Sequence, residues 1–372
     1  MAGKIPATVV TGFLGAGKTT LIRHMLENAG GRRIALIINE FGDLGVDGGI
    51  LSGCGIEGCT EDDVMELSNG CICCTVAEDF VPTLEKLLNR AEPPEHIVIE
   101  TSGLALPQPL VRAFNWPEIR TRVTVDGVIT VVDGPAVAKG QFAGDVAAVD
   151  AQRASDDMLD HDTPLSELFE DQMACADMVV VNKADLLGDG PAEALAQELR
   201  KRSRIGVQVL KARMGAVDPA VLLGLGVGAE DHMDVRGEVH HHHHHDDHDD
   251  DHHPDDHHEH HHHHEHHHEH GHDAFESFVV TLPALSDPEA FVSRISAVIA
   301  AQGILRLKGF AAVSGKPMRL VIQAVGPRVD THFDRPFAAD EAQETRLVVI
   351  GEAGLDQAAI RAALEEGLDL AA

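Results

Sequence analysis

Two groups of residues in this chain have types and spacing that suit chemistry. Three cysteines fall within four positions, at Cys71, Cys73 and Cys74, and a glycine-rich segment spans residues 12–19. Thiolates are soft ligands that suit zinc, cobalt and related ions, whereas a glycine loop of this pattern cradles nucleotide phosphates. Their presence in one chain suggests that metal binding and nucleotide state are coupled.

The glycine-rich segment, GFLGAGKT, fits the complete phosphate-binding loop (P-loop) pattern. It follows a β-branched run at residues 8–10 and precedes a helical pattern at residues 19–28, a context that makes a chance glycine turn a poor alternative. Backbone N–H groups would surround the phosphates, the Lys18 ammonium would reach the outer ones, and the Thr19 hydroxyl would bind magnesium. The expected nucleotide ligands are Gly12, Gly15, Ala16, Gly17, Lys18, Thr19 and Thr20.

Asn182, Lys183 and Asp185 form an N-K-x-D motif directly after an apolar run at residues 178–181. In this motif the aspartate accepts hydrogen bonds from N1–H and the exocyclic amine of guanine, a pair of donors that adenine lacks. The motif therefore favours GTP over ATP, although Asn and Asp are also common in ordinary turns.

Glu100 and Gly103 belong to an ETSG sequence that ends the apolar run at residues 97–99. A P-loop sheet places an acidic residue near magnesium and a glycine near the γ-phosphate at this point. We predict that Glu100 orients water or the magnesium shell, and that Lys18, Thr19 and Glu100 carry catalysis. A strand end followed by a turn is the alternative.

Cys71 and Cys73 follow a Ser-Asn-Gly turn signal and face the same way if their segment is extended. The two thiolates can then chelate one ion, with Cys74 pointing elsewhere unless the turn is tight. Buried, inert cysteines are the alternative, which three thiols in four positions make less attractive. The upstream Cys54 and Cys59 are not assigned as ligands.

Apolar runs of strand length alternate with helical patterns along the first 225 residues. They lie at residues 8–10, 34–38, 96–100, 128–132, 178–181 and 206–210. Near-continuous runs of this kind are typical of parallel strands that helices cover on both faces. We predict an α/β fold with a doubly wound, mostly parallel P-loop sheet over residues 1–225.

The next segment breaks this pattern. Residues 240–273 hold 21 of the 26 histidines and 11 Asp or Glu, with no Lys or Arg. Such a composition cannot bury a core, so we predict a disordered His/Asp-rich insert over residues 226–273, introduced by a flexible glycine run at residues 224–228. Mixed imidazoles and carboxylates favour low-specificity buffering of divalent ions, and a plain spacer is the alternative.

Residues 274–372 show a second pattern, with strands expected at residues 275–282, 305–313, 318–325 and 345–350. Helices are expected at residues 287–301 and 355–368. A Ser-Gly-Lys-Pro turn between the second and third strands predicts a hairpin. This order predicts a small α+β domain with an antiparallel sheet.

The formal net charge of −32 repels nucleic acids and anionic membranes, so neither is an expected partner. No run of about 18 apolar residues suits a transmembrane helix. The clustered thiols suit a reducing compartment, and no convincing signal-peptide cleavage pattern is present, so we expect a cytoplasmic protein. Cys175 lies in a helical pattern that predicts core packing. The oligomeric state is left open.

Five motifs together resemble the CobW family of metal-handling GTPases, relatives of the nickel-insertion GTPases. They are GFLGAGKTT, NEFGDLGVD at residues 39–47, NGCICC at 69–74, ETSG at 100–103 and NKAD at 182–185. The segment after the histidine-rich tract is similar to the CobW C-terminal domain. The resemblance implies that Cys71, Cys73 and Cys74 form a metal site, that Glu40 adds an oxygen ligand, and that Asp43 lies near magnesium. Residues 105–117 resemble the branch associated with cobalt delivery in cobalamin synthesis.

These features predict a GTP-hydrolysing metallochaperone. It would bind a divalent metal, expected to be cobalt, at the CxCC site in the GTP state and deliver it on hydrolysis, with cobaltochelatase as the expected client. Its cofactors would be GTP, Mg2+ and either Co2+ or Zn2+. The alternatives are a zinc-handling member of the same family, a metal-storage protein with a vestigial P-loop, and a small-molecule P-loop kinase, which NKAD argues against.

Overall fold

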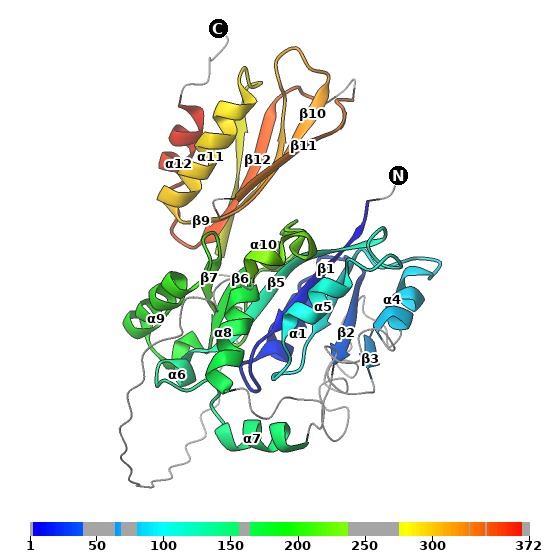
Figure 1. Ribbon diagram of the computed structural model, residues 1–372. Coiled ribbons are helices and arrows are strands. Elements are labelled where there is room, and N and C mark those ends of the chain that lie inside the picture. Colours follow the sequence, from blue (N-terminus) through cyan, green and yellow to red (C-terminus); the bar gives the residue numbers. More distant parts are fainter. Residues whose placement is uncertain are drawn as a thin grey trace.

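The computed structural model describes residues 3–39, 64–67, 80–155, 164–236, 275–326, 328–338 and 341–366. The first part forms one sheet of seven parallel strands, ordered β3-β2-β4-β1-β5-β6-β7 (Figure 1). The strands are β1 (Ile5–Thr11), β2 (Ile34–Asn39), β3 (Val64–Leu67), β4 (His96–Glu100), β5 (Val123–Asp133), β6 (Met178–Asn182) and β7 (Gln208–Lys211). Their apolar sequences suit burial on both faces.

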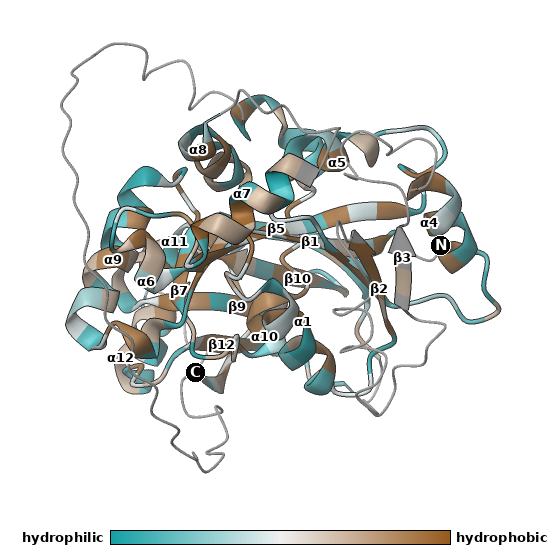
Figure 2. Cartoon of the chain, turned by 90° about the horizontal axis from the view of Figure 1, so that it is seen from below, coloured by the Kyte–Doolittle hydropathy of each residue, from teal (hydrophilic) through white to brown (hydrophobic). Residues whose placement is uncertain are grey.

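Helices cover both faces of this sheet. In β6, Met178 and Val180 join one hydrophobic cluster, whereas Val179 and Val181 join a second cluster. Figure 2 shows hydrophobic residues gathered on the strands and hydrophilic ones on the outer helices. The helices are α1 (Lys18–Glu27), α4 (Val81–Leu88), α5 (Pro107–Ala113), α6 (Gly134–Val137), α7 (Val146–Ser155), α8 (Leu165–Cys175), α9 (Asp189–Arg202) and α10 (Pro219–Leu222), with the 3-10 turn η3 (Ala184–Leu186). The predicted doubly wound parallel sheet is confirmed.

The second part is an antiparallel sheet of five strands, ordered β11-β10-β9-β12-β8, with two helices on one face. Its elements are β8 (Phe275–Leu282), α11 (Pro288–Gln302), β9 (Ile304–Ala311), β10 (Met318–Val325), β11 (Arg328–Pro336), β12 (Thr345–Glu352) and α12 (Gln357–Glu365). The pairing of Leu320 with Ala311 confirms the predicted hairpin. The sequence does not predict β11, because this exposed edge strand is rich in charged residues. None of the helices in the described ranges combines the length and the hydrophobicity that a membrane span requires.

The disordered insert was predicted to begin at residue 226, and this boundary is wrong. Residues 226–236 include two 3-10 turns, η4 (Ala229–His232) and η5 (Asp234–Arg236), that pack on the first domain. The Glu230 carboxylate accepts hydrogen bonds from Thr124 Oγ1 at 2.6 Å and from Val125 N at 2.9 Å. Arg236, only 1% exposed, donates to Asp177 at 2.7 Å. The histidine-rich tract at residues 240–273 lies outside the described residues.

The glycine run at residues 224–228, predicted to be flexible, is held at defined positions. The N–H groups of Gly224 and Gly226 donate to the Asp126 carboxylate at 2.5 and 2.7 Å. Both glycines have positive φ angles, so here glycine serves a turn that binds a buried carboxylate. Amino-acid composition alone does not show whether a glycine run forms such a turn or a flexible linker.

One arginine of the second domain, Arg306 in β9, joins the two domains. Its buried guanidinium donates to the carbonyl oxygen of Ala220 at 2.6 Å and also to the carbonyls of Leu223 and Gly224. A guanidinium presents several N–H groups in a fixed fork, which suits a cluster of carbonyls. The arginine therefore ties β9 to the segment that leaves the parallel sheet after β7.

The hydrophobic core continues across this contact between the two domains, which we call the joint. Leu305, Val325 and Ile350 of the second domain belong to the same hydrophobic cluster as the core of the parallel sheet. His96 and Asp126, which lie toward the amino ends of β4 and β5, are close to the joint. The second domain thus lies near the amino ends of the parallel strands, at the end of the sheet away from their carboxyl ends (Figure 1).

Candidate nucleotide site

The P-loop joins the carboxyl end of β1 to α1 and closes against β5 and β6. Gly12 has a φ of 134°, and a Cβ there would lie 2.1 Å from the Val131 carbonyl oxygen. Gly17 has a φ of 101°, and a Cβ there would lie 2.2 Å from Asn182 Nδ2. Only glycine fits both positions, because conformation and contact each exclude a side chain. Gly15 lies exposed on the loop.

The two side chains expected near magnesium lie side by side. Thr19 Oγ1 donates a hydrogen bond to Glu100 Oε1 at 2.9 Å, and Glu100 is 5% exposed. Lys18 Nζ donates to the Phe13 carbonyl oxygen at 3.3 Å, so its ammonium lies against the loop. Gly103 also approaches the loop, since a Cβ there would lie 2.6 Å from the backbone nitrogen of Leu14.

Asn182 links three segments of the site. Its Nδ2 donates to the Ala16 carbonyl oxygen at 2.9 Å, and its Oδ1 accepts from Gly215 N at 2.9 Å. Gly215 belongs to the turn after β7 and also approaches α1, where a Cβ on Gly215 would lie 2.9 Å from the carbonyl carbon of Thr20. The buried amide therefore holds the P-loop, the N-K-x-D motif and the β7 turn in one arrangement.

The other two motif residues differ in their surroundings. Lys183 has a left-handed φ of 57°, and its Nζ donates to Asp133 Oδ2 at 2.6 Å. Asp133 is buried at the end of β5 and also accepts from Ala136 N at 3.1 Å, which caps α6. Asp185 is exposed, and its carboxylate has no partner among the residues placed by the structure. The motif offers one fixed ammonium and one open carboxylate.

The loop that carries Gly103 is fixed from α8. Gln172 is fully buried, and its Nε2 donates to the carbonyl oxygens of Gly103 at 3.1 Å and Ala105 at 3.3 Å. The backbone carbonyl oxygen of Gln172 accepts a hydrogen bond from Thr130 Oγ1 of β5 at 3.0 Å. Gln172 therefore holds the ETSG turn against the P-loop.

Asp133, Gln172 and Gly215 complete this site, and the sequence analysis does not identify them. Asp133 ends an apolar run, as Glu100 does. Because the carboxyl ends of parallel strands meet at one edge of the sheet, the sequence could have identified Asp133 as a residue of this site. Gln172 offers only the weak signal of a polar residue among apolar helix positions. Gly215 has no signal beyond a short turn.

The predicted metal ligands Cys71, Cys73, Cys74, Glu40 and Asp43 lie outside the described residues. Within the described ranges, no group of three or more His, Cys, Asp or Glu could hold a metal ion. Burial raises the pKa of the Cys175 thiol to about 12, so this cysteine stays protonated and serves packing, as predicted.

The chemistry of this edge fits a nucleoside triphosphate with magnesium. The α1 helix starts at Lys18 with no side-chain cap, so its first N–H groups face the glycine loop, where they attract anions. The Lys18 ammonium adds positive charge. The oxygens of Thr19 and Glu100 are ligands of the hard type that magnesium prefers.

Comparisons with known proteins match both parts of the chain. A family model described as the CobW/HypB/UreG nucleotide-binding domain matches residues 6–210, and one described as the cobalamin synthesis protein cobW C-terminal domain matches residues 275–368. A Sinorhizobium protein named zinc chaperone CobW is 57% identical over 362 residues, which are 97% of each chain. A Pseudomonas aeruginosa protein of the same name is 53% identical over 98% of this chain and 92% of its own. The Escherichia coli zinc chaperone YjiA is 30% identical over 93% of this chain and 94% of its own.

Proposed function

Because this chain belongs to the CobW family, we propose that it is a GTP-hydrolysing metallochaperone. In this proposal the chain holds a divalent metal ion with Cys71, Cys73 and Cys74 while GTP is bound. Glu40 supplies an oxygen ligand to the same ion. Hydrolysis loosens the site and releases the ion to a client protein.

The proposed coupling between metal binding and nucleotide state rests on the order of three strands in the sheet and on where they end. In the register of the sheet, Glu100 of β4 pairs with Ile38 of β2, and Asn39 at the end of β2 pairs with Leu67 at the end of β3. The ends of β2 and β3 therefore lie next to each other, and β2 lies next to Glu100. In the sequence, Glu40 directly follows the last residue of β2, and Cys71 follows four positions after the last residue of β3. This juxtaposition supports a metal site that responds to the γ-phosphate.

Guanine selection is assigned to the N-K-x-D motif. The open Asp185 carboxylate would accept hydrogen bonds from N1–H and the exocyclic amine of guanine. Asn182 supports this role indirectly, because it connects the motif to the P-loop through the Ala16 carbonyl. Lys183 is held in place by Asp133 for contact with the base.

Hydrolysis is assigned to three side chains. Lys18 would neutralise charge on the outer phosphates, Thr19 would bind magnesium, and Glu100 would orient the attacking water or the water shell of the ion. When bound, magnesium supplies further neutralisation of phosphate charge. We place Asp43 near the same ion.

The cargo is proposed to be zinc or cobalt. Two relatives that are more than half identical carry the name zinc chaperone, which supports zinc. Thiolate sites also bind zinc more tightly than cobalt, so affinity alone selects zinc. Cobalt would require selection by the client, with cobaltochelatase as the proposed acceptor. Transfer from zinc-loaded and cobalt-loaded protein to cobaltochelatase, started by GTP, separates these two cases.

The histidine-rich tract is proposed to buffer metal with low specificity. Its 21 imidazoles greatly outnumber the three clustered thiols. Deleting residues 240–273 should lower the number of zinc ions bound per chain and leave the GTP hydrolysis rate almost unchanged. An unchanged zinc stoichiometry would exclude the buffer.

A GTPase assay tests the proposal against a pure storage function. We expect GTP hydrolysis by the full chain to change when zinc or cobalt is added, and to be lost in Lys18→Ala. The Cys71→Ser/Cys73→Ser variant should hydrolyse GTP without responding to metal. A storage protein would bind metal equally well in Lys18→Ala and would show no metal-dependent hydrolysis.

A further inference from the structure

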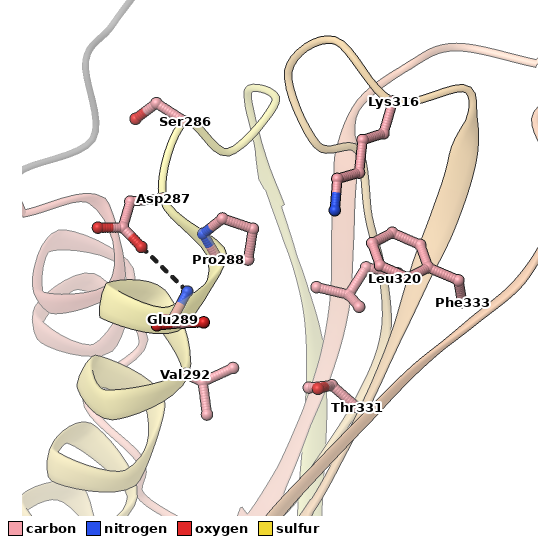
Figure 3. Close-up of a pocket in the computed structure, with 9 residues that line it drawn as sticks. All are labelled: Ser286, Asp287, Pro288, Glu289, Val292, Lys316, Leu320, Thr331 and Phe333. Carbon is pink, nitrogen blue, oxygen red and sulfur yellow. Dashed lines mark hydrogen bonds between the residues drawn. The ribbon is translucent and has the colours of Figure 1, made fainter.

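The second domain contains a cavity of about 600 Å³ that has no part in the nucleotide site. It lies between the first turns of α11 and the strands β10 and β11, as Figure 3 shows. A volume of this size is typical of sites that bind a ligand or a peptide side chain. The residues that matter here are Glu289 and Val292 from α11, Lys316 and Leu320 from the β9–β10 hairpin, and Thr331 and Phe333 from β11. We call this region the β11 groove.

One wall of the groove is an edge strand. β11 pairs with β10 and, within the ranges that the structure describes, with no strand on its other side. The outward N–H and C=O groups of such a strand can pair with another chain. Thr331 pairs with Ile322 and Phe333 with Leu320, so both side chains point to the helix-covered face and into the groove (Figure 3).

The groove combines an apolar floor with opposite charges on facing walls. Phe333 is 41% exposed, which is unusual for a large apolar side chain. The Lys316 ammonium lies 4.7 Å from the Phe333 ring centroid and has no carboxylate partner among the described residues. Across the groove, the exposed Glu289 carboxylate likewise makes no ion pair there, whereas neighbouring Asp287 is committed to capping α11.

We propose that the β11 groove docks an extended segment of a client protein. The segment adds a strand to the free edge of β11 and places an apolar side chain on Phe333, Leu320 and Val292. An acidic residue of the segment meets Lys316, and a basic residue meets Glu289. Main-chain pairing supplies affinity, and the pocket and the two charges supply specificity. The proposal rests on the proposed function only in taking the client to be the protein that receives the metal.

A phage-displayed library of random nine-residue peptides, a length that matches β11, provides the probe. Selection on the full chain should enrich peptides with a central aliphatic or aromatic residue flanked by one acidic and one basic residue. Thr331→Trp fills the groove, and it should weaken binding of the enriched peptide at least about tenfold in fluorescence anisotropy. His332→Trp adds the same bulk on the opposite face of the same strand and should change binding little.

Exchanging the two charges of the groove tests whether they determine which peptide binds. The Lys316→Glu/Glu289→Lys variant should prefer a peptide whose two charged residues are exchanged. The proposal is overturned if selection yields no peptide that binds the full chain more tightly than it binds the Thr331→Trp variant. It is overturned equally if Thr331→Trp and His332→Trp weaken peptide binding to the same extent. It is also overturned if the full chain self-associates through the groove, seen as dimerisation that Thr331→Trp abolishes.

Metal binding and GTP hydrolysis of both tryptophan variants are measured in parallel. If peptide binding behaves as expected but metal binding never responds to GTP, the groove stands and the metallochaperone function fails. If the metal and nucleotide results hold but no peptide binds, only the groove is lost.

Discussion

Asn182 and Asp185 lie three positions apart and use their polar atoms in opposite ways. Both ends of the Asn182 amide are satisfied inside the protein, by Ala16 and Gly215. The Asp185 carboxylate is exposed to solvent. A buried amide is stable only when it is hydrogen-bonded, so Asn182 serves the architecture of the site, whereas Asp185 is available to bind the base.

Exchanging the hydrogen-bonding groups at Asp185 should exchange the preferred base. Xanthine carries a carbonyl where guanine carries the exocyclic amine, and the side-chain amide introduced by Asp185→Asn could donate to that carbonyl. This substitution should therefore lower GTP affinity by about tenfold to a hundredfold and raise XTP affinity. Binding of fluorescent GTP and XTP analogues measures both. Equal losses for the two nucleotides would contradict the assigned role.

Individual residues were predictable where a short motif fixes their role. The P-loop residues, Glu100 and Asn182 come together at one edge of the sheet as the motifs indicate. Gln172 and Gly215 have no such motif, because their roles arise from contacts between segments far apart in the chain. Topology, which a local pattern does not encode, decides those contacts.

At the scale of elements, the ends of β5 and β6 are joined by one charged contact. Asp133 ends β5, and its carboxylate holds the Lys183 ammonium directly after β6. Charge-assisted hydrogen bonds of this kind contribute about 1.5–3 kcal/mol. The contact therefore fixes Lys183, for which we propose contact with the base, while the same carboxylate caps the start of α6.

A double-mutant cycle separates these two roles. Asp133→Asn and Lys183→Met should each weaken GDP binding by about tenfold, and the double variant should lose little more, because both changes break one contact. Isothermal titration calorimetry of GDP binding to the parent chain, the two single variants and the double variant gives the coupling energy between Asp133 and Lys183. Fully additive losses would mean that Asp133 acts only through the α6 cap.

Apolar runs predicted the central strands and the hairpin, whereas β3 and β11 escaped prediction. β3 has only four residues, and β11 is an exposed edge strand with alternating charges. Edge strands lack the continuous apolar signal because only one side or neither side is buried. The same limit explains why the groove beside β11 has no sequence motif.

At the scale of the whole molecule, one segment connects the nucleotide site with the second domain. It begins at the turn that contains Gly215, held by Asn182, and continues through α10 to the carbonyls that Arg306 binds. The joint also encloses a buried polar chain, in which Thr8 Oγ1 lies 2.8 Å from His96 Nε2 and 3.4 Å from Asp126 Oδ2. These contacts join the amino-terminal parts of β1, β4 and β5 beneath the joint.

Stability should fall as the pH is lowered, because of His96. Burial lowers its pKa from the ordinary 6.5 to about 4; nearby Asp126 favours the charged form, whereas Arg32 and Arg306 oppose it. Between these two values the unfolded chain binds a proton that the folded chain does not. The free energy of unfolding should thus fall by up to about 3 kcal/mol as the pH falls from 6.5 toward 4, and His96 should cause no pH dependence above that range.

His96→Gln removes this titration and keeps a hydrogen-bonding side chain beside Thr8. Urea unfolding from about pH 7 to about pH 5 should show the stability advantage of the parent chain over His96→Gln shrinking as the pH falls. The comparison cancels the histidines that both proteins share. Parallel curves would show that His96 is not buried in its neutral form.

In the proposed mechanism, GTP closes the thiol metal site. The direct measurement is zinc affinity of the full chain, by chelator competition, with a non-hydrolysable GTP analogue and with GDP. A Cys71→Ser/Cys73→Ser/Cys74→Ser variant defines the binding that belongs to the histidine-rich tract. We predict that the analogue tightens zinc binding at least about tenfold and that this gain disappears in the variant. Equal zinc affinities in the two nucleotide states would contradict the proposed control of the metal site by GTP.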